Sequence, residues 1–237
     1  MNNYNLIMWS RNYEDTFEKQ VERVYSSLLE MSKIEELVPR YLTGKSKKTA
    51  PEFELTRESV ELLIEKNTDK KYAHLGTGTS IGFFTSKDDS KICSISITSG
   101  NKNPILTNSI NVNISSMDLS NDIVKRNHII ELFKKLVEIN NPFYACIVDY
   151  KNEQLYDSFY DNDKKIPKCI FWINYFGREV VERLSQINVS IDNIKNEIYH
   201  LEQQEEGYFI RLTETSIFDE VKKVALQKKI NKEMGLG

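Results

Sequence analysis

The sequence has 237 residues, which suits one large domain or two small ones and can bury a core without disulfides or metals. Hydrophobic residues make up 40% and charged residues 28%, a globular balance that excludes a mostly disordered chain. The 32 Lys and Arg against 35 Asp and Glu give a net charge of −3, so general affinity for nucleic acid is not expected.

Cysteine and histidine usage indicates neither a disulfide framework nor a metal site. The three cysteines are odd in number and no CxxC occurs, which favours buried thiols in a reducing compartment. The three histidines lie far apart, and we predict no metal and no cofactor. The N-terminus lacks the pattern of a signal peptide, and the longest apolar run, Phe143–Val148, is far shorter than the ~18 residues of a membrane span. We therefore expect a cytoplasmic protein without a membrane segment.

The first third of the chain reads as a strand followed by two helices. Residues 4–9 are typical of a short strand. Apolar residues then recur at helical spacing and predict a helix over about 14–37, which Pro39 ends. Thr56 is a suitable N-cap for a second helix that runs to about residue 66.

The middle of the chain is predicted to be β-structure. Segments 79–86, 91–99 and 109–115 are rich in β-branched residues, and the last two alternate clearly between apolar and polar side chains. Such alternation is typical of antiparallel strands with one buried and one polar face.

The rest of the chain alternates helices and strands. Ser120 is a good cap for a third helix ending near residue 140, with Leu119 and Val124 placed as a hydrophobic staple. Further elements follow: strands at 143–149, 170–176 and 208–214, a short helix after Gly177, and a last helix opening at Ser216. This order predicts an α+β fold, in which a mixed, largely antiparallel sheet carries four or five helices. Residues 1–237 are expected to form a single domain, or two lobes that meet near residue 142.

The most informative segment is DYKNEQLYDSFYDND at 149–163, in which acids and aromatics alternate. Aromatic side chains supply contact area and carboxylates supply steering, a combination common at interfaces for basic partners. The other interpretation is a connecting loop whose aromatics fold back onto the core. If the segment binds a partner, its candidate contacts are Asp149, Glu153, Tyr156, Asp157, Phe159, Tyr160, Asp161 and Asp163.

A second interpretation of the same segment is enzymatic. Asp149 and Lys151 follow an apolar strand in the Asp-x-Lys order that metal-dependent nucleases use, where the carboxylate binds Mg²⁺ and the lysine helps to activate water. A second acid, such as Asp118 or Asp122, would have to converge on the pair. The motif is short and arises easily in a lysine-rich chain, so an ordinary strand end is the simpler interpretation.

Several stretches resemble the immunity protein 52 family of bacterial polymorphic-toxin systems. They are MWSRNYEDTFEKQVERVYSSLLEMSKI near the N-terminus, VPRYLTGKS, IGFFTS, FWINYFG with the helix after it, and GYFIRLTE before the terminal helix. The resemblance implies a non-catalytic cytoplasmic α+β protein. It also implies a gene beside that of a toxin, often one with a restriction-endonuclease-type nuclease domain, which the protein neutralises.

These observations together predict an immunity protein rather than an enzyme. Its expected partner is the cognate secreted toxin encoded by a neighbouring gene, most often a nuclease, and occlusion of the toxin's active site is the simplest mechanism. Two alternatives stay open: a metal-dependent nuclease that uses Asp149 and Lys151, and a cytoplasmic adaptor whose partner is not a toxin.

Overall fold

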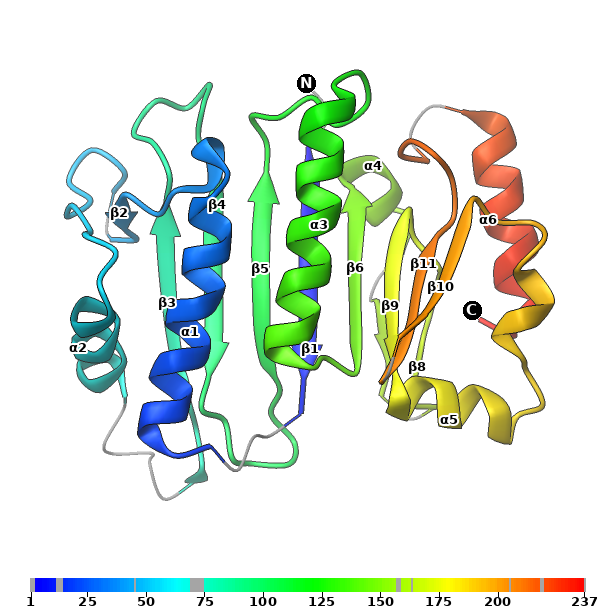
Figure 1. Ribbon diagram of the computed structural model, residues 1–237, viewed down its shortest axis with the longest axis horizontal. Helices are drawn as coiled ribbons and strands as arrows, with labels where there is room; N and C mark the ends of the chain where they lie inside the picture. Colours follow the sequence, from blue (N-terminus) through cyan, green and yellow to red (C-terminus); the bar gives the residue numbers. More distant parts are fainter. Residues whose placement is uncertain are drawn as a thin grey trace.

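The computed structural model describes residues 3–11, 15–44, 46–68, 75–156, 159–162, 164–204, 206–217 and 220–236. Its main feature is a nine-stranded sheet with the strand order β10-β11-β9-β6-β1-β5-β4-β3-β2 (Figure 1). All neighbouring strands in it are antiparallel. The described residues also form six α-helices, of which α4 has only four residues. The predicted α+β class is therefore confirmed.

The N-terminal strand lies at the centre of the sheet. β1 (Tyr4–Ser10) pairs with β5 (Asn108–Ile114) on one side and with β6 (Tyr144–Asp149) on the other. Elements before and after residue 142 thus share one sheet. Beyond β5 come β4 (Ser94–Ser99), β3 (Thr79–Phe84) and the two-residue edge strand β2 (Tyr41–Leu42).

The second half of the sheet contains strands from the C-terminal part of the chain. β6 is followed by β9 (Ile173–Gly177), β11 (Gly207–Arg211) and the edge strand β10 (His200–Gln204). A separate small hairpin joins β7 (Tyr160–Asp161) to β8 (Ile166–Pro167).

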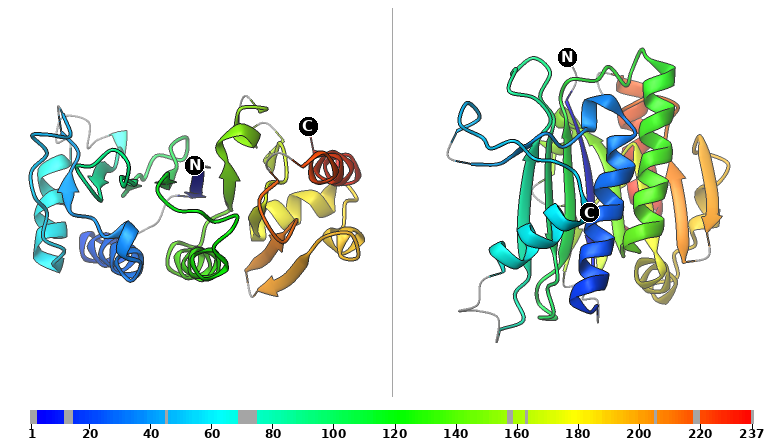
Figure 2. Two further views of the ribbon diagram at one scale, coloured as in Figure 1. Left: turned by 90° about the horizontal axis from the view of Figure 1, so that it is seen from above. Right: turned by 60° about the vertical axis from the view of Figure 1, so that its left-hand side comes forward.

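Two long helices cover one face of the sheet. Figure 2 shows α1 (Phe17–Ser32) and α3 (Ile123–Asn140) side by side on this face, and α2 (Arg57–Asn67) lies at the β2 edge. α1 buries an apolar stripe of the predicted helical spacing, with Val21, Val24, Leu28 and Met31 all inaccessible to solvent. The predicted cap of the second helix is confirmed, because the Thr56 side chain accepts a hydrogen bond from the Ser59 amide at 3.1 Å.

The other three described helices lie against the second half of the sheet. α4 (Tyr150–Glu153) and α6 (Val221–Glu233) lie on the side opposite α3, and α5 (Arg178–Gln186) packs beside β9 (Figure 2). No helix of the described residues covers the corresponding face of β5, β4 and β3, where the polar side chains of the alternating strands stay accessible.

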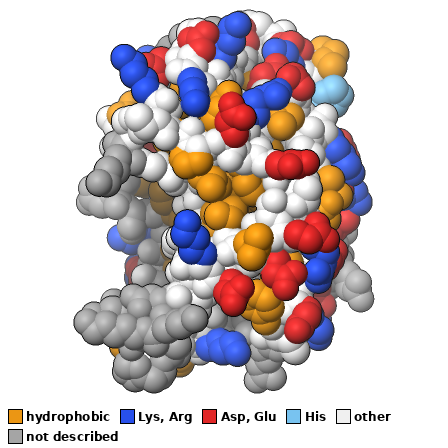
Figure 3. All heavy atoms as spheres, turned by 90° about the vertical axis from the view of Figure 1, so that its left-hand side faces the viewer, with side chains coloured by type: hydrophobic (Ala, Val, Ile, Leu, Met, Phe, Trp, Pro, Cys, Tyr) orange, Lys and Arg blue, Asp and Glu red, His pale blue; other side chains and the backbone are white. Residues whose placement is uncertain are grey.

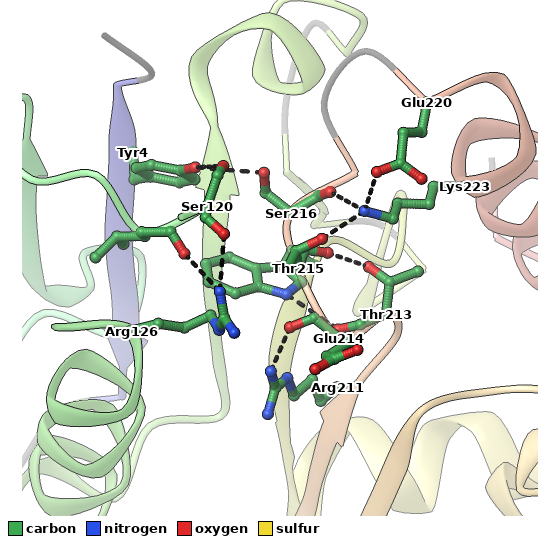
Figure 4. Close-up of polar contacts among 12 residues, drawn as sticks. Tyr4, Ser120, Arg126, Arg211, Thr213, Glu214, Thr215, Ser216, Glu220 and Lys223 are labelled. Atoms are coloured by element: carbon green, nitrogen blue, oxygen red, sulfur yellow. Dashed lines mark hydrogen bonds and ion pairs between the residues drawn. The ribbon is translucent and has the colours of Figure 1, made fainter. Parts of the chain in front are cut away.

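Two predicted helix starts are wrong. The third helix is capped by Asp122, whose Oδ1 accepts the amides of Val124 and Lys125, each at 3.0 Å. Val124 is exposed and forms no staple with the buried Leu119. The last helix begins at Val221 rather than at Ser216. The Ser216 hydroxyl is buried instead, 3.3 Å from the Tyr4 hydroxyl, which also contacts Ser120 at 2.8 Å (Figure 4).

Among the described residues, all three cysteines are buried and free, as predicted. In the same residues, no helix has the length and apolar character needed to cross a membrane.

Candidate binding surface

The predicted segment 149–163 covers the end of β6, all of α4 and the strand β7. It lies on the face of the sheet opposite α1 and α3 (Figures 1 and 2). Two of its predicted contact residues, Asp157 and Asp163, lie outside the described residues. The other six are described, and most of them have a clear role within the chain.

The acids of the segment are largely engaged in internal contacts. Asp149 is 1% exposed, and its Oδ1 caps α4 by accepting the Asn152 amide at 2.9 Å. Glu153 accepts a hydrogen bond from the Asn5 side chain at 2.5 Å. Asp161 accepts the Lys164 amide at 2.9 Å and lies 3.7 Å from the Lys164 ammonium. Each of the three described acids of the segment thus has a hydrogen-bond partner within the chain.

The aromatic residues of the segment fold back onto the sheet. The ring of Phe159 lies 5.7 Å from Trp9 and 5.2 Å from Phe171, and Tyr156 meets Phe171 edge-on at 5.7 Å. Tyr160 packs edge-on against Phe143 at 5.0 Å. Burial raises the pKa values of the Tyr156 and Tyr160 hydroxyls well above their ordinary value. Tyr156, Phe159 and Tyr160 therefore pack against the rest of the protein, as the loop interpretation of this segment predicted.

Asp149 and Lys151, the residues of the nuclease interpretation, differ in their exposure to solvent. Asp149 is buried and acts as a helix cap, whereas Lys151 is exposed. The two acids considered as partners also cap local structure: Asp122 starts α3, and Asp118 accepts two hydrogen bonds from Asn121. Across the described part of the chain, no three His, Cys, Asp or Glu side chains gather where they could hold a metal ion.

The role of Asp149 as a cap gives a direct prediction. Asp149→Ala should lower the free energy of unfolding by about 1–2 kcal/mol, because α4 loses the acceptor for the Asn152 amide. Asp149→Asn should cost clearly less, since its side-chain oxygen can accept the same hydrogen bond. Urea denaturation of the two variants measures this difference. An equal loss in both would show that the charge, and not the cap, matters.

A groove of about 470 Å³ lies between α4 and α6. Its apolar side chains include Leu155, which is 64% exposed, and Val221, which is 85% exposed. Lys151, Lys228 and the exposed Glu220 also line it, together with the buried Asp149. The groove offers apolar contact area with a border of mixed charge, unlike the acidic surface that the sequence predicted.

The uncovered sheet face is a third feature, to which the sequence analysis gave no function. Apart from Phe84, its side chains are mostly short and polar, and they line a hollow of about 590 Å³ over β3, β4 and β5. Ser80 and Thr98 share a hydrogen bond at 2.8 Å, and Asn113 donates to Asn5 at 2.9 Å. None of the described residues that line the hollow is charged. The face can form hydrogen bonds but provides no electrostatic steering.

Comparisons with known proteins identify a similar fold but no family. No family model matches the chain, and no curated protein matches it. A solved structure of the Pseudomonas aeruginosa T6SS protein PA0821 is similar, with a TM-score of 0.65 and 9% sequence identity. The match covers 99% of this chain and 73% of that chain. At this identity the similarity shows a shared fold.

Proposed function

We propose that this protein is an immunity-type protein that binds a cognate secreted toxin and neutralises it by covering the toxin's active site. The observation that carries the proposal is the fold shared with a T6SS protein over 99% of this chain. The immunity protein 52 family, which stretches of the sequence resemble, implies the same function, although no family model matches the chain. In this proposal the protein acts in the cytoplasm of the cell that makes the toxin.

The chemistry of the described residues supports binding rather than catalysis. Asp118, Asp122 and Asp149 are the acids that a metal-dependent nuclease would need, and each is engaged as a cap. In segment 149–163, Tyr150 and Leu155 are exposed, and Leu155 lines the groove between α4 and α6. We therefore assign the buried Asp149 and the packed Tyr156, Phe159 and Tyr160 a supporting role. Direct contacts of this segment would come from its exposed side chains.

Co-expression with the product of the neighbouring toxin gene tests the proposal. Cells that make the toxin domain alone should stop growing, and cells that also make this protein should grow normally. A one-to-one complex should be recovered when this protein is used as bait, because occlusion requires stable binding. The matched control is an unrelated immunity protein, expressed at the same level, which should give no rescue.

The possible outcomes separate the alternatives. Binding without rescue would favour an adaptor over an immunity protein. Neither binding nor rescue would contradict the proposed function for that toxin. Mg²⁺-dependent cleavage of DNA by this protein, lost in Asp149→Ala but kept in Asp161→Ala, would support the nuclease interpretation instead.

A further inference from the structure

The edge of the molecule at β2 and α2 has apolar side chains that are partly or largely exposed. Figure 3 views this edge and shows hydrophobic side chains gathered near its centre, with acidic side chains beside them. Leu62 of α2 is 65% exposed. Phe53 and Leu55, in the segment that leads into α2, are half-buried against the core. We call these three residues, with Glu54, Glu58, Glu61 and Glu65, the α2 face.

Leu62 is not part of the face by which α2 packs. The helix buries Val60 and Ile64 against the rest of the protein, and Leu62 points away from them. Residues three and four positions apart are neighbours on a helix surface, so Glu58 and Glu65 lie one turn on either side of Leu62. The outer side of α2 therefore presents an apolar side chain with an acidic residue one turn away on either side.

The charge around this patch is unbalanced. Residues 52–66 contain five glutamates against Arg57 and Lys66. Arg57 already lies 3.6 Å from Glu22 and 3.5 Å from Glu61. Glu54, Glu58 and Glu65 are exposed, and none forms an ion pair with another described residue. Asp149, Glu153 and Asp161 of segment 149–163 accept hydrogen bonds from other described residues, whereas the carboxylates of these three glutamates face solvent.

We propose that the α2 face is the surface that binds the toxin, and that the toxin presents to it a cationic surface with an apolar centre. This inference rests on the proposed function and adds the contact surface and the chemistry of the partner. Its basis is charge complementarity, because an acidic rim attracts a basic partner and the apolar centre supplies burial once the two are docked. The other two surfaces lack this combination: the residues that line the open sheet face are uncharged, and the groove between α4 and α6 is bordered by two lysines as well as by Glu220.

The rim is tested by the association rate with the purified toxin domain from the neighbouring gene. Glu54→Lys with Glu65→Lys should slow association at low salt by about tenfold or more, and the effect should shrink as salt is added. The fold should tolerate both changes, because Glu54 precedes the helix and a lysine at position 65 lies near its C-terminus. The control is Glu182→Lys with Asp192→Lys, an equal change of charge at exposed positions near the other edge. The control should change the rate by less than about twofold, since distant charges are screened.

The apolar centre is tested by Leu62→Gln, which keeps a good helix former at the position. Dissociation of the complex should be about tenfold faster or more, since most interface substitutions act on this rate, while the urea midpoint stays unchanged. In one contrary outcome, the unaltered protein, the two α2-face variants and the control all associate with the toxin and dissociate from it at equal rates. That result would show that the α2 face is not the binding surface, and the proposed function would stand. Absence of binding by the unaltered protein would overturn both.

Discussion

Trp172→Ala is expected to lower the free energy of unfolding by about 3–5 kcal/mol, the usual range for a fully buried aromatic. Trp172 immediately precedes β9 and is inaccessible to solvent. Its ring lies 5.8 Å from the ring of Tyr4 in the central strand, and its Nε1 donates to the Thr213 carbonyl at 3.1 Å. Its loss leaves a cavity where β1, β9 and the chain after β11 meet. Urea denaturation, followed by circular dichroism, measures the change.

The conservative variant separates the cavity from the hydrogen bond. Trp172→Phe keeps most of the apolar contact but leaves the Thr213 carbonyl without its donor, so its cost should be about 1–3 kcal/mol. A loss below about 1 kcal/mol in Trp172→Ala would contradict the placement of this side chain in the core.

Gln227→Met should cost about 2–4 kcal/mol, although it keeps the length of the side chain. Gln227 and Asn152 exchange two hydrogen bonds of 2.9 Å, and Gln227 also donates to the Ile170 carbonyl at 2.7 Å. Both side chains are buried, so methionine leaves the Asn152 amide and this carbonyl unsatisfied in the interior. This pair ties α6 to α4. The same urea experiment measures the loss.

Lys228→Met is the matched control, because position 228 is the next residue of the same helix and is exposed. Its effect should stay within about 0.5 kcal/mol. If the two methionine variants were equally stable, the buried amide pair would not be a structural link between α6 and α4.

Elements with a regular apolar pattern could be predicted from the sequence. The stripe through Val21, Val24 and Leu28 predicted α1, and the alternation around Ile95 and Ile97 predicted β4. In both cases burial of one face determines the structure, so the pattern in the sequence is enough. The Thr56 cap could also be found, because capping depends on neighbouring residues.

The features that were missed or misplaced depend on residues far apart in the chain. Ser216 has the sequence of a helix cap, but its hydroxyl meets Tyr4 at the other end of the chain. β10 lacks a clear apolar pattern because it is an edge strand. Its Glu202 pairs with Lys134 of α3 at 2.6 Å, and that hydrogen bond lowers the pKa of Glu202. Neither contact can be inferred from local sequence.

The difference between local patterns and long-range contacts also explains why the packing of the predicted site could not be inferred from the sequence. Acids and aromatics in segment 149–163 suggested an interface, whereas the structure buries Asp149 as a cap and packs Phe159 against Trp9. The α2 face that we propose as a contact surface was not predicted, because its acids are spread among apolar residues. The exposure of Leu62 becomes visible only when the other side of the helix is seen to be packed.

The most direct test of the central claim is titration of the purified toxin domain with this protein. The account predicts that toxin activity falls in proportion to the added protein and reaches zero at one equivalent, because one molecule occludes one active site. Full toxin activity in the presence of a large excess of correctly folded protein would contradict it.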